Sequence, residues 1–356
     1  MLISGLLVGL LLGFVMQRGR FCVTGAFRDI WVAKSTWWLG AFIVAIAVQA
    51  VGVAALNAAG VIQVSEAVSQ FAPVGTVIGA FVFGFGIVLA GGCATGTYYR
   101  AGEGLVGSWF ALIFYALFAS IFKYGALAET TGFMRHYGVT ENATIYETLG
   151  VSMWVPVVAL ALIAGFWAYR NLSKPKLPMA QLPAEKKGLA HLLTEKSWNP
   201  YATAVVVGII AMLAFPASWA TGRQGGLGIT TPSANAVQYL GTGDAKFVDW
   251  GVLLVGGILL GSYIAAKASG EFKVRVPDAK TIMRSGVGGA LMGWGAAWAG
   301  GCSIGNGLVE TALFSWQGWV ALVAMILGTG AAAYLFVIPR RARRTAATPA
   351  KNLQTA

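Results

Sequence analysis

The chain has 356 residues, of which 57% are hydrophobic and only 11% are charged. A soluble domain typically has about 25% charged residues, so this composition excludes that class and, with its long apolar runs, indicates an all-α polytopic membrane protein. The formal net charge of +12 would suggest a nucleic-acid partner in a soluble protein, but Lys and Arg lie mainly between the apolar runs. We therefore expect the lipid bilayer as surroundings and no nucleic acid. Three cysteines and two histidines show neither a zinc spacing nor an even disulfide framework, so we expect no metal and no other cofactor.

The first membrane half is predicted to comprise residues 1–170. Its apolar runs predict five crossings, which are assigned to residues 2–16, 37–56, 73–100, 105–122 and 151–169. The short apolar stretch FCVTGAF follows the first crossing, and we expect it to form a re-entrant element. Residues 58–72 and 123–150 are expected to be loops.

The second membrane half is predicted to comprise residues 201–338. A Pro- and Lys-rich stretch at residues 171–200 separates it from the first half and is interpreted as a basic cytoplasmic linker. Four crossings are expected, and the stretch TGRQGGLGITTPS is the expected counterpart of FCVTGAF, although it has no cysteine. Residues 339–356 are predicted to form a disordered, basic cytoplasmic tail.

One thirteen-residue pattern occurs in both halves. Gly84–Gly96 reads GFGIVLAGGCATG, and Gly293–Gly305 reads GWGAAWAGGCSIG. Paired glycines weaken a helix by about 1 kcal/mol each relative to alanine. A helix that is interrupted at the same place in two halves indicates the binding site of a transporter. The glycine pairs of the two predicted breaks are Gly91, Gly92, Gly300 and Gly301.

The distribution of Lys and Arg predicts the orientation of the chain. With a periplasmic N-terminus, nine crossings and a cytoplasmic C-terminus, all Lys and Arg fall on the cytoplasmic side except Lys123, Arg135, Arg223 and Lys246. The two segments with the repeated pattern then cross in opposite directions, which predicts an inverted internal repeat.

The three cysteines, Cys22, Cys93 and Cys302, each follow a glycine-containing break. Non-helical backbone at membrane depth is tolerated where it lines a polar path or is buried in protein. In apolar surroundings we expect the thiols to stay protonated, and a thiol is a soft, weak donor that suits an anion with soft sulfur atoms. Close helix packing, a thiolate site for Cu(I), and persulfide chemistry remain alternative interpretations.

Other polar residues near the breaks are further candidates for the substrate path. Each also has an ordinary explanation, such as anchoring at the membrane surface, capping of a helix, or satisfying the helix backbone. These candidates are Arg20, Arg100, Thr24, Ser303, Glu103 and Glu310.

Three stretches together resemble the YeeE/YedE sulfur-transport membrane family. They read RGRFCVTGAFRD, AGGCATGTYYRAGEG and AGGCSIGNG, and the likeness extends from residue 6 to about residue 338. The resemblance implies a bacterial inner-membrane protein with nine membrane helices plus re-entrant elements in a pseudo-symmetric, hourglass-like arrangement. It also implies thiosulfate uptake that depends on three cysteines, which correspond here to Cys22, Cys93 and Cys302.

The family also implies a cytoplasmic partner, a TusA-like sulfur carrier called YeeD. Its YedE branch is linked to selenium metabolism, so transport of another soft sulfur or selenium compound is a second interpretation. We therefore expect a transporter of thiosulfate rather than an enzyme. A membrane sulfurtransferase, which would take up sulfur as a cysteine persulfide, is the alternative from another class.

Overall fold

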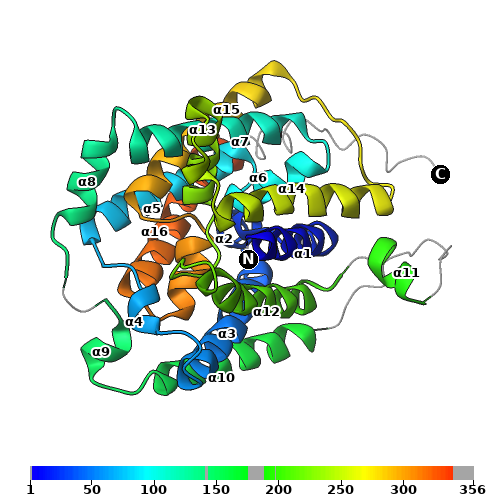
Figure 1. Ribbon diagram of the computed structural model, residues 1–356. Coiled ribbons are helices and arrows are strands. Elements are labelled where there is room, and N and C mark those ends of the chain that lie inside the picture. The colour runs from blue at the N-terminus through cyan, green and yellow to red at the C-terminus, as the bar shows by residue number, and fades with distance from the viewer. Residues whose placement is uncertain (1, 141–142, 175–187, 197, 340–356) are drawn as a thin grey trace.

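The computed structural model describes residues 2–140, 143–174, 188–196 and 198–339, and most of them lie in helices (Figure 1). The helices of the first half are α1 (Ile3–Gly19), α2 (Val23–Val32), α3 (Trp37–Ala58), α4 (Val64–Ala67), α5 (Pro73–Ala90), α6 (Ala94–Gly102), α7 (Val106–Tyr124), α8 (Ala128–His136), α9 (Ile145–Leu149) and α10 (Trp154–Leu172). The later elements are α11 (Gly188–Thr194), α12 (Pro200–Trp219), α13 (Thr230–Thr242), η1 (Ala245–Phe247), α14 (Trp250–Ala268), α15 (Ala279–Trp298), η2 (Gly305–Glu310), α16 (Trp316–Ala332) and η3 (Ala333–Val337).

The expected all-α polytopic membrane fold is confirmed. Among the described residues, 8 helical segments are long and apolar enough to cross a membrane, and two of them are the broken pairs α1–α2 and α5–α6. The remaining crossing that we expected corresponds to α15. Its 20 residues are long enough to span a bilayer, but its glycines and two basic residues lower its hydropathy. Because α15 packs against α5 and α7, it needs less apolar surface than a lipid-facing helix.

The two stretches expected to be loops contain short helices, which corrects the sequence analysis. Residues 58–72 include α4, and residues 123–150 include α8 and α9. Local capping explains α9, because the Thr144 side chain accepts a hydrogen bond from the Glu147 N–H. Tertiary packing explains α8, which is polar in composition but lies against α5, α7 and α15. The expected linker falls partly, and the expected tail almost wholly, outside the described residues.

The helices pack in reciprocal pairs. Helix α1 packs on α14, and α12 packs on α3; likewise α7 packs on α15, and α16 packs on α5. If α1, α3, α5 and α7 are matched in order with α12, α14, α15 and α16, each contact has a counterpart in the other half. The contacts α1–α12 and α5–α15 then each join a helix to its own counterpart. This reciprocity agrees with the predicted internal repeat.

The early glycines of the repeated pattern serve this packing. An added Cβ at Gly84 would meet the backbone of α16, and one at Gly293 would meet the backbone of α7. Similarly, Gly86 faces α15 and Gly295 faces α5. Close helix packing therefore explains the first two glycines of the pattern, as that alternative interpretation expected, and leaves the GGC portion for the breaks.

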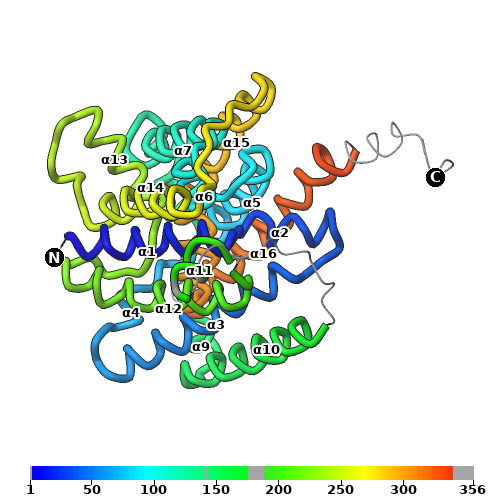
Figure 2. Tube along the Cα trace, turned by 90° about the vertical axis from the view of Figure 1, so that its right-hand side faces the viewer, coloured from blue at the N-terminus to red at the C-terminus, as the bar shows by residue number. Residues whose placement is uncertain are grey.

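The two ends of the described chain lie at opposite ends of the bundle. Figure 2 shows the start of α1 at one side and η3 at the other, with the broken segments between them. The placement of the termini on opposite sides of a membrane stays a prediction.

Candidate substrate path

Each cysteine sulfur lies at a backbone break and accepts a backbone hydrogen bond. Cys22 is the N-cap of α2 and accepts from Gly25 N–H at 3.4 Å. Cys93 is the N-cap of α6 and accepts from Gly96 N–H at 3.4 Å. Cys302 precedes η2 and accepts from Ile304 N–H at 3.4 Å. The sulfurs thus occupy the position in which helix ends attract electron-rich groups.

Two of the breaks depend on a glycine in the left-handed backbone region. Gly91 has φ +73° and Gly300 has φ +76°, values at which a side chain is strained. Gly92 and Gly301 lie between these residues and the cysteines. The four glycines proposed from the sequence therefore form the turns that end α5 and α15.

A buried hydroxyl accompanies every cysteine. Thr24 is 3% exposed, and Thr95 and Ser303 are fully buried. The Thr24 and Thr95 hydroxyl oxygens make no hydrogen bond within the protein, and the Ser303 hydroxyl is a hydrogen-bonding neighbour of the Cys93 sulfur. Leaving a buried hydroxyl unpaired costs roughly 1–3 kcal/mol, so these hydroxyls are candidate donors to a bound anion.

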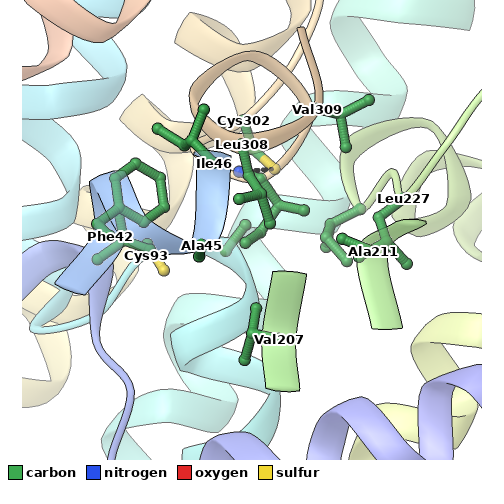
Figure 3. Packing of buried hydrophobic residues seen from close by; sticks show 14 of the residues in the cluster. Phe42, Ala45, Ile46, Cys93, Val207, Ala211, Leu227, Cys302, Leu308 and Val309 are labelled. Carbon is green, nitrogen blue, oxygen red and sulfur yellow. Dashed lines mark hydrogen bonds between the residues drawn. The ribbon is translucent and has the colours of Figure 1, made fainter. Parts of the chain in front are cut away.

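The three breaks converge on Cys93. Its thiol has Cys22 and Cys302 as electrostatic neighbours and the Ser303 hydroxyl as a hydrogen-bonding neighbour. Figure 3 shows Cys93 and Cys302 among apolar side chains that include Phe42 of α3. The convergence means that one passing ligand could meet all three thiols in turn.

Arg100 connects two of the breaks. Its Nη2 donates to the Cys22 sulfur at 3.6 Å, and its Nη1 donates to the Gly91 carbonyl. It also lines a cavity of about 390 Å³ that borders the Gly91 turn. We call this the three-arginine cavity, and its lining includes Gly91, Arg100, Ser108, Arg275, Arg284 and Ser285.

A second cavity, of about 180 Å³, reaches Cys302, and we call it the Cys302 cavity. Its wall is the glycine-rich loop between α12 and α13 together with the second break. The lining includes Ser69, Arg223, Gly300, Gly301, Cys302 and Glu310. One of its groups is unsatisfied, because Arg223 Nη1 is buried without a hydrogen-bond partner.

Arg20 and Glu103 belong to an ion-pair cluster instead of facing either cavity. Arg20 Nη1 lies 2.7 Å from Glu103 Oε1, and its Nη2 lies 2.7 Å from Glu271 Oε2. Glu271 also lies 3.4 Å from Arg18. Burial raises the pKa of Glu103, and the positive charge of Arg20 opposes this effect. The cluster ties the α1–α2 break to the end of α6 and to the loop after α14.

Several residues at these cavities were not identified as site residues from the sequence. Arg223 lines the Cys302 cavity, Lys123 donates to Thr231 at its edge, and the Arg135 guanidinium lies against Gly300. All three are exceptions to the positive-inside distribution, and that is the signal that could have identified them. By contrast, nothing in the sequence predicted that Tyr115 Oη donates to Thr230 at 2.9 Å, next to Cys302.

All three cysteines are free thiols. In the described part of the chain, no group of three or more His, Cys, Asp or Glu side chains is placed so that it could hold a metal ion.

Comparison with known proteins relates this geometry to a family. The sulphur transport family matches residues 18–331. The thiosulfate transporter TsuA of Escherichia coli K12 is 53% identical over 98% of this chain and 99% of that protein. TsuA of Spirochaeta thermophila is 36% identical over 94% of this chain and 99% of that protein.

A third relative matches only one region. The probable transporter YedE of Escherichia coli K12 is 43% identical over 29% of this chain and 25% of that protein. The nearly full-length matches confirm the resemblance noted in the sequence. The chain therefore belongs to the YeeE/YedE sulphur transport family.

Proposed function

We propose that this protein carries thiosulfate across a membrane into the cytoplasm. The observation that carries the proposal is the nearly full-length similarity to two thiosulfate transporters. The geometry supports it, because three thiols with buried hydroxyls and broken helix ends form an arrangement suited to a small sulfur-containing anion.

The proposed route runs from the Cys302 cavity past Cys93 to Cys22. The anion first meets Arg223 and the second break, and then passes the central thiol. It leaves beside Arg100 into the three-arginine cavity. Arg100 supports this order, because its guanidinium contacts Cys22 and also lines the three-arginine cavity.

The chemistry of the route fits weak and repeated contacts. A neutral thiol donates a weak hydrogen bond to sulfur or oxygen and adds no negative charge to the path of a dianion. The hydroxyls of Thr24, Thr95 and Ser303 would donate to the sulfonate oxygens. Several weak sites suit transport better than one tight site, because the anion must also be released.

The surroundings of the protein are part of the same proposal. We place it in the bacterial inner membrane with the N-terminus periplasmic and the C-terminus cytoplasmic. Residues 1–170 and 201–338 would be two inverted halves joined by the linker at residues 171–200. A TusA-like sulfur carrier of the YeeD type would receive the sulfur at the cytoplasmic face, on which we also place the linker and the basic tail.

Uptake in cells tests the proposal. Cells that lack other sulfate and thiosulfate importers would receive this chain, and uptake of radiolabelled thiosulfate would be measured. We expect uptake with the unmodified chain and its loss with Cys93→Ala and Cys302→Ala at equal membrane protein level. Absence of uptake with the unmodified chain would contradict the proposed substrate.

Mass spectrometry separates transport from sulfur transfer. After exposure to thiosulfate, a transporter that uses only transient hydrogen bonds leaves all three cysteines unmodified. A persulfide on any of them would instead favour the membrane sulfurtransferase, the alternative from another class.

A further inference from the structure

Glu310 is a buried acid that faces the Cys302 cavity without an ion-pair partner. It is 7% exposed and lies at the end of η2. Its Oε1 accepts hydrogen bonds from the Ser69 hydroxyl at 2.6 Å and the Ser69 N–H at 3.3 Å. Its Oε2 is buried and makes no ion pair, and the Ser315 hydroxyl is the other hydrogen-bonding neighbour of the carboxyl. A salt bridge to Glu310 is absent from the described part of the chain.

In the described part of the chain, the charged groups around Glu310 make no salt bridge with it. Arg223 lines the same cavity but makes no salt bridge with Glu310. Arg135 on α8 donates to Gln317 at 2.7 Å, and its charge acts on Glu310 without a direct bond. Helices α3 and α16, which pack on η2, contain no charged residue. The other titratable groups on this side are Glu66, Lys123, His136 and Cys302.

The size of the cavity brings this acid close to any anion that enters. The cavity has about 180 Å³, and Cys302, Arg223 and Glu310 share its wall. A divalent anion and an ionised carboxylate in so small a space repel one another strongly, because little water remains to screen them. A protonated carboxyl removes that repulsion, and its O–H becomes a donor for the anion.

We propose that Glu310 binds a proton when a divalent anion occupies the Cys302 cavity, so that anion binding is coupled to proton uptake. The proposal rests on the proposed function, because it takes thiosulfate as the anion. It deepens that function by naming a second ligand, the proton. Entry of a dianion into a cell with a negative interior is opposed by the membrane potential, and a proton that accompanies it reduces the charge moved.

The corresponding acid of the first half cannot take this role. Glu103 follows Cys93 as Glu310 follows Cys302, but it is paired with Arg20 at 2.7 Å and faces neither cavity. An Arg partner stabilises the ionised form of a carboxyl. The coupling is therefore assigned to the Cys302 cavity alone.

Calorimetric titration of purified protein with sodium thiosulfate tests the coupling. Thiosulfate stays a dianion between about pH 5.5 and about pH 8, so a proton taken up on binding must come to the protein. We expect affinity to fall by up to about tenfold per pH unit in the upper part of this range, as required when one proton binds with the anion. Glu310→Gln mimics the protonated acid, so its affinity should stay nearly constant.

Two control variants isolate Glu310. Glu66→Gln removes a carboxylate that bonds the cavity-lining residue Gln224, and His136→Gln removes the imidazole at the end of α8. Both should retain the pH dependence of the unmodified chain. A Glu310→Gln variant with an unchanged pH dependence would overturn the proposal.

If Glu310→Gln does not fold, a measurement on the unmodified chain still tests the coupling. Titrating the unmodified chain in buffers of different ionisation enthalpy gives the number of protons bound per anion. We expect up to about one proton, and a value of zero across the range would overturn the coupling. Absence of any binding of thiosulfate would instead contradict the proposed function, and the coupling with it.

Discussion

The two breaks with the same sequence pattern have different structures after the cysteine. In the first half, Cys93 caps a regular helix, α6. In the second half, Cys302 is followed by a turn and the π-helix η2, and its sulfur accepts from the Ile304 N–H within that turn. The difference shows that the GGC pattern determines the turn and not the helix beyond it.

The breaks also differ in how their carbonyl groups are satisfied. Arg100 donates to the Gly91 carbonyl from within α6. In the second break, Asn306 Nδ2 donates to the Ala299 carbonyl at 2.9 Å and to the Gly301 carbonyl at 3.0 Å. A cation thus holds the first break and a neutral amide holds the second, where the acid Glu310 lies nearby. We infer that the first break favours release of an anion and the second controls its entry.

Loss of the central thiol, that of Cys93, should have the largest effect on uptake. Cys93→Ala removes the sulfur that lies between Cys22 and Cys302, and we expect uptake to fall by more than about tenfold at equal protein level. Cys93→Ser, which keeps a small donor but loses the polarizable sulfur, should retain part of the uptake. Normal uptake by both variants in a radiolabel assay would show that the thiol is not on the route.

Replacement of Arg100 should have the next largest effect. Arg100→Gln removes the cation that contacts Cys22 and the Gly91 carbonyl, and we expect uptake to fall about five- to tenfold. Arg100→Lys should retain part of the uptake, because the positive charge remains. It should not retain all of it, because the planar guanidinium that donates to two partners is lost. Arg170→Gln, on α10, is the control for a general loss of positive charge and should transport normally. Equal rates for the Arg100 and Arg170 variants would contradict the proposed release step.

Much of this comparison was accessible from the sequence. Apolar runs predicted the helices, and the repeated glycines predicted the two breaks and the cysteines beside them. The contact between Arg100 and Cys22 was not predictable, because it joins residues 78 positions apart through the packing of α6 near α1. The π-helix was also missed, since its register depends on Asn306 and its bond from Gln317 at 2.8 Å rather than on the pattern.

The ion pairs show a similar limit to what could be predicted from the sequence. Arg20 and Glu103 were selected as path candidates because they flank the cysteine elements, but the structure pairs them with each other and with Glu271. Sequence proximity to a break identifies residues near the path, and only the fold decides which of them face it.

The two left-handed glycines offer a matched test of stability. Gly91→Ala and Gly300→Ala should each cost about 1 kcal/mol of backbone strain. Gly300→Ala should cost about 1 kcal/mol more, because the new methyl group displaces the Arg135 guanidinium from its bond to Gln317, whereas Gly91 has open space. Thermal unfolding in detergent measures the difference. A variant pair with equal midpoints would mean that Arg135 moves aside without cost.

Arg20→Gln should have the smallest effect. The substitution breaks the pairs with Glu103 and Glu271, but the Arg20 side chain is 51% exposed, so we expect a loss of about 1 kcal/mol in the free energy of unfolding. Uptake per folded molecule should stay within about twofold of the unmodified chain, because the guanidinium faces neither cavity. Arg28→Gln, which breaks only a pair with the adjacent Asp29, is the matched control. A loss of uptake as large as that of Arg100→Gln, in a protein of normal stability, would move Arg20 from the ion-pair cluster onto the route and remove the distinction between the two arginines.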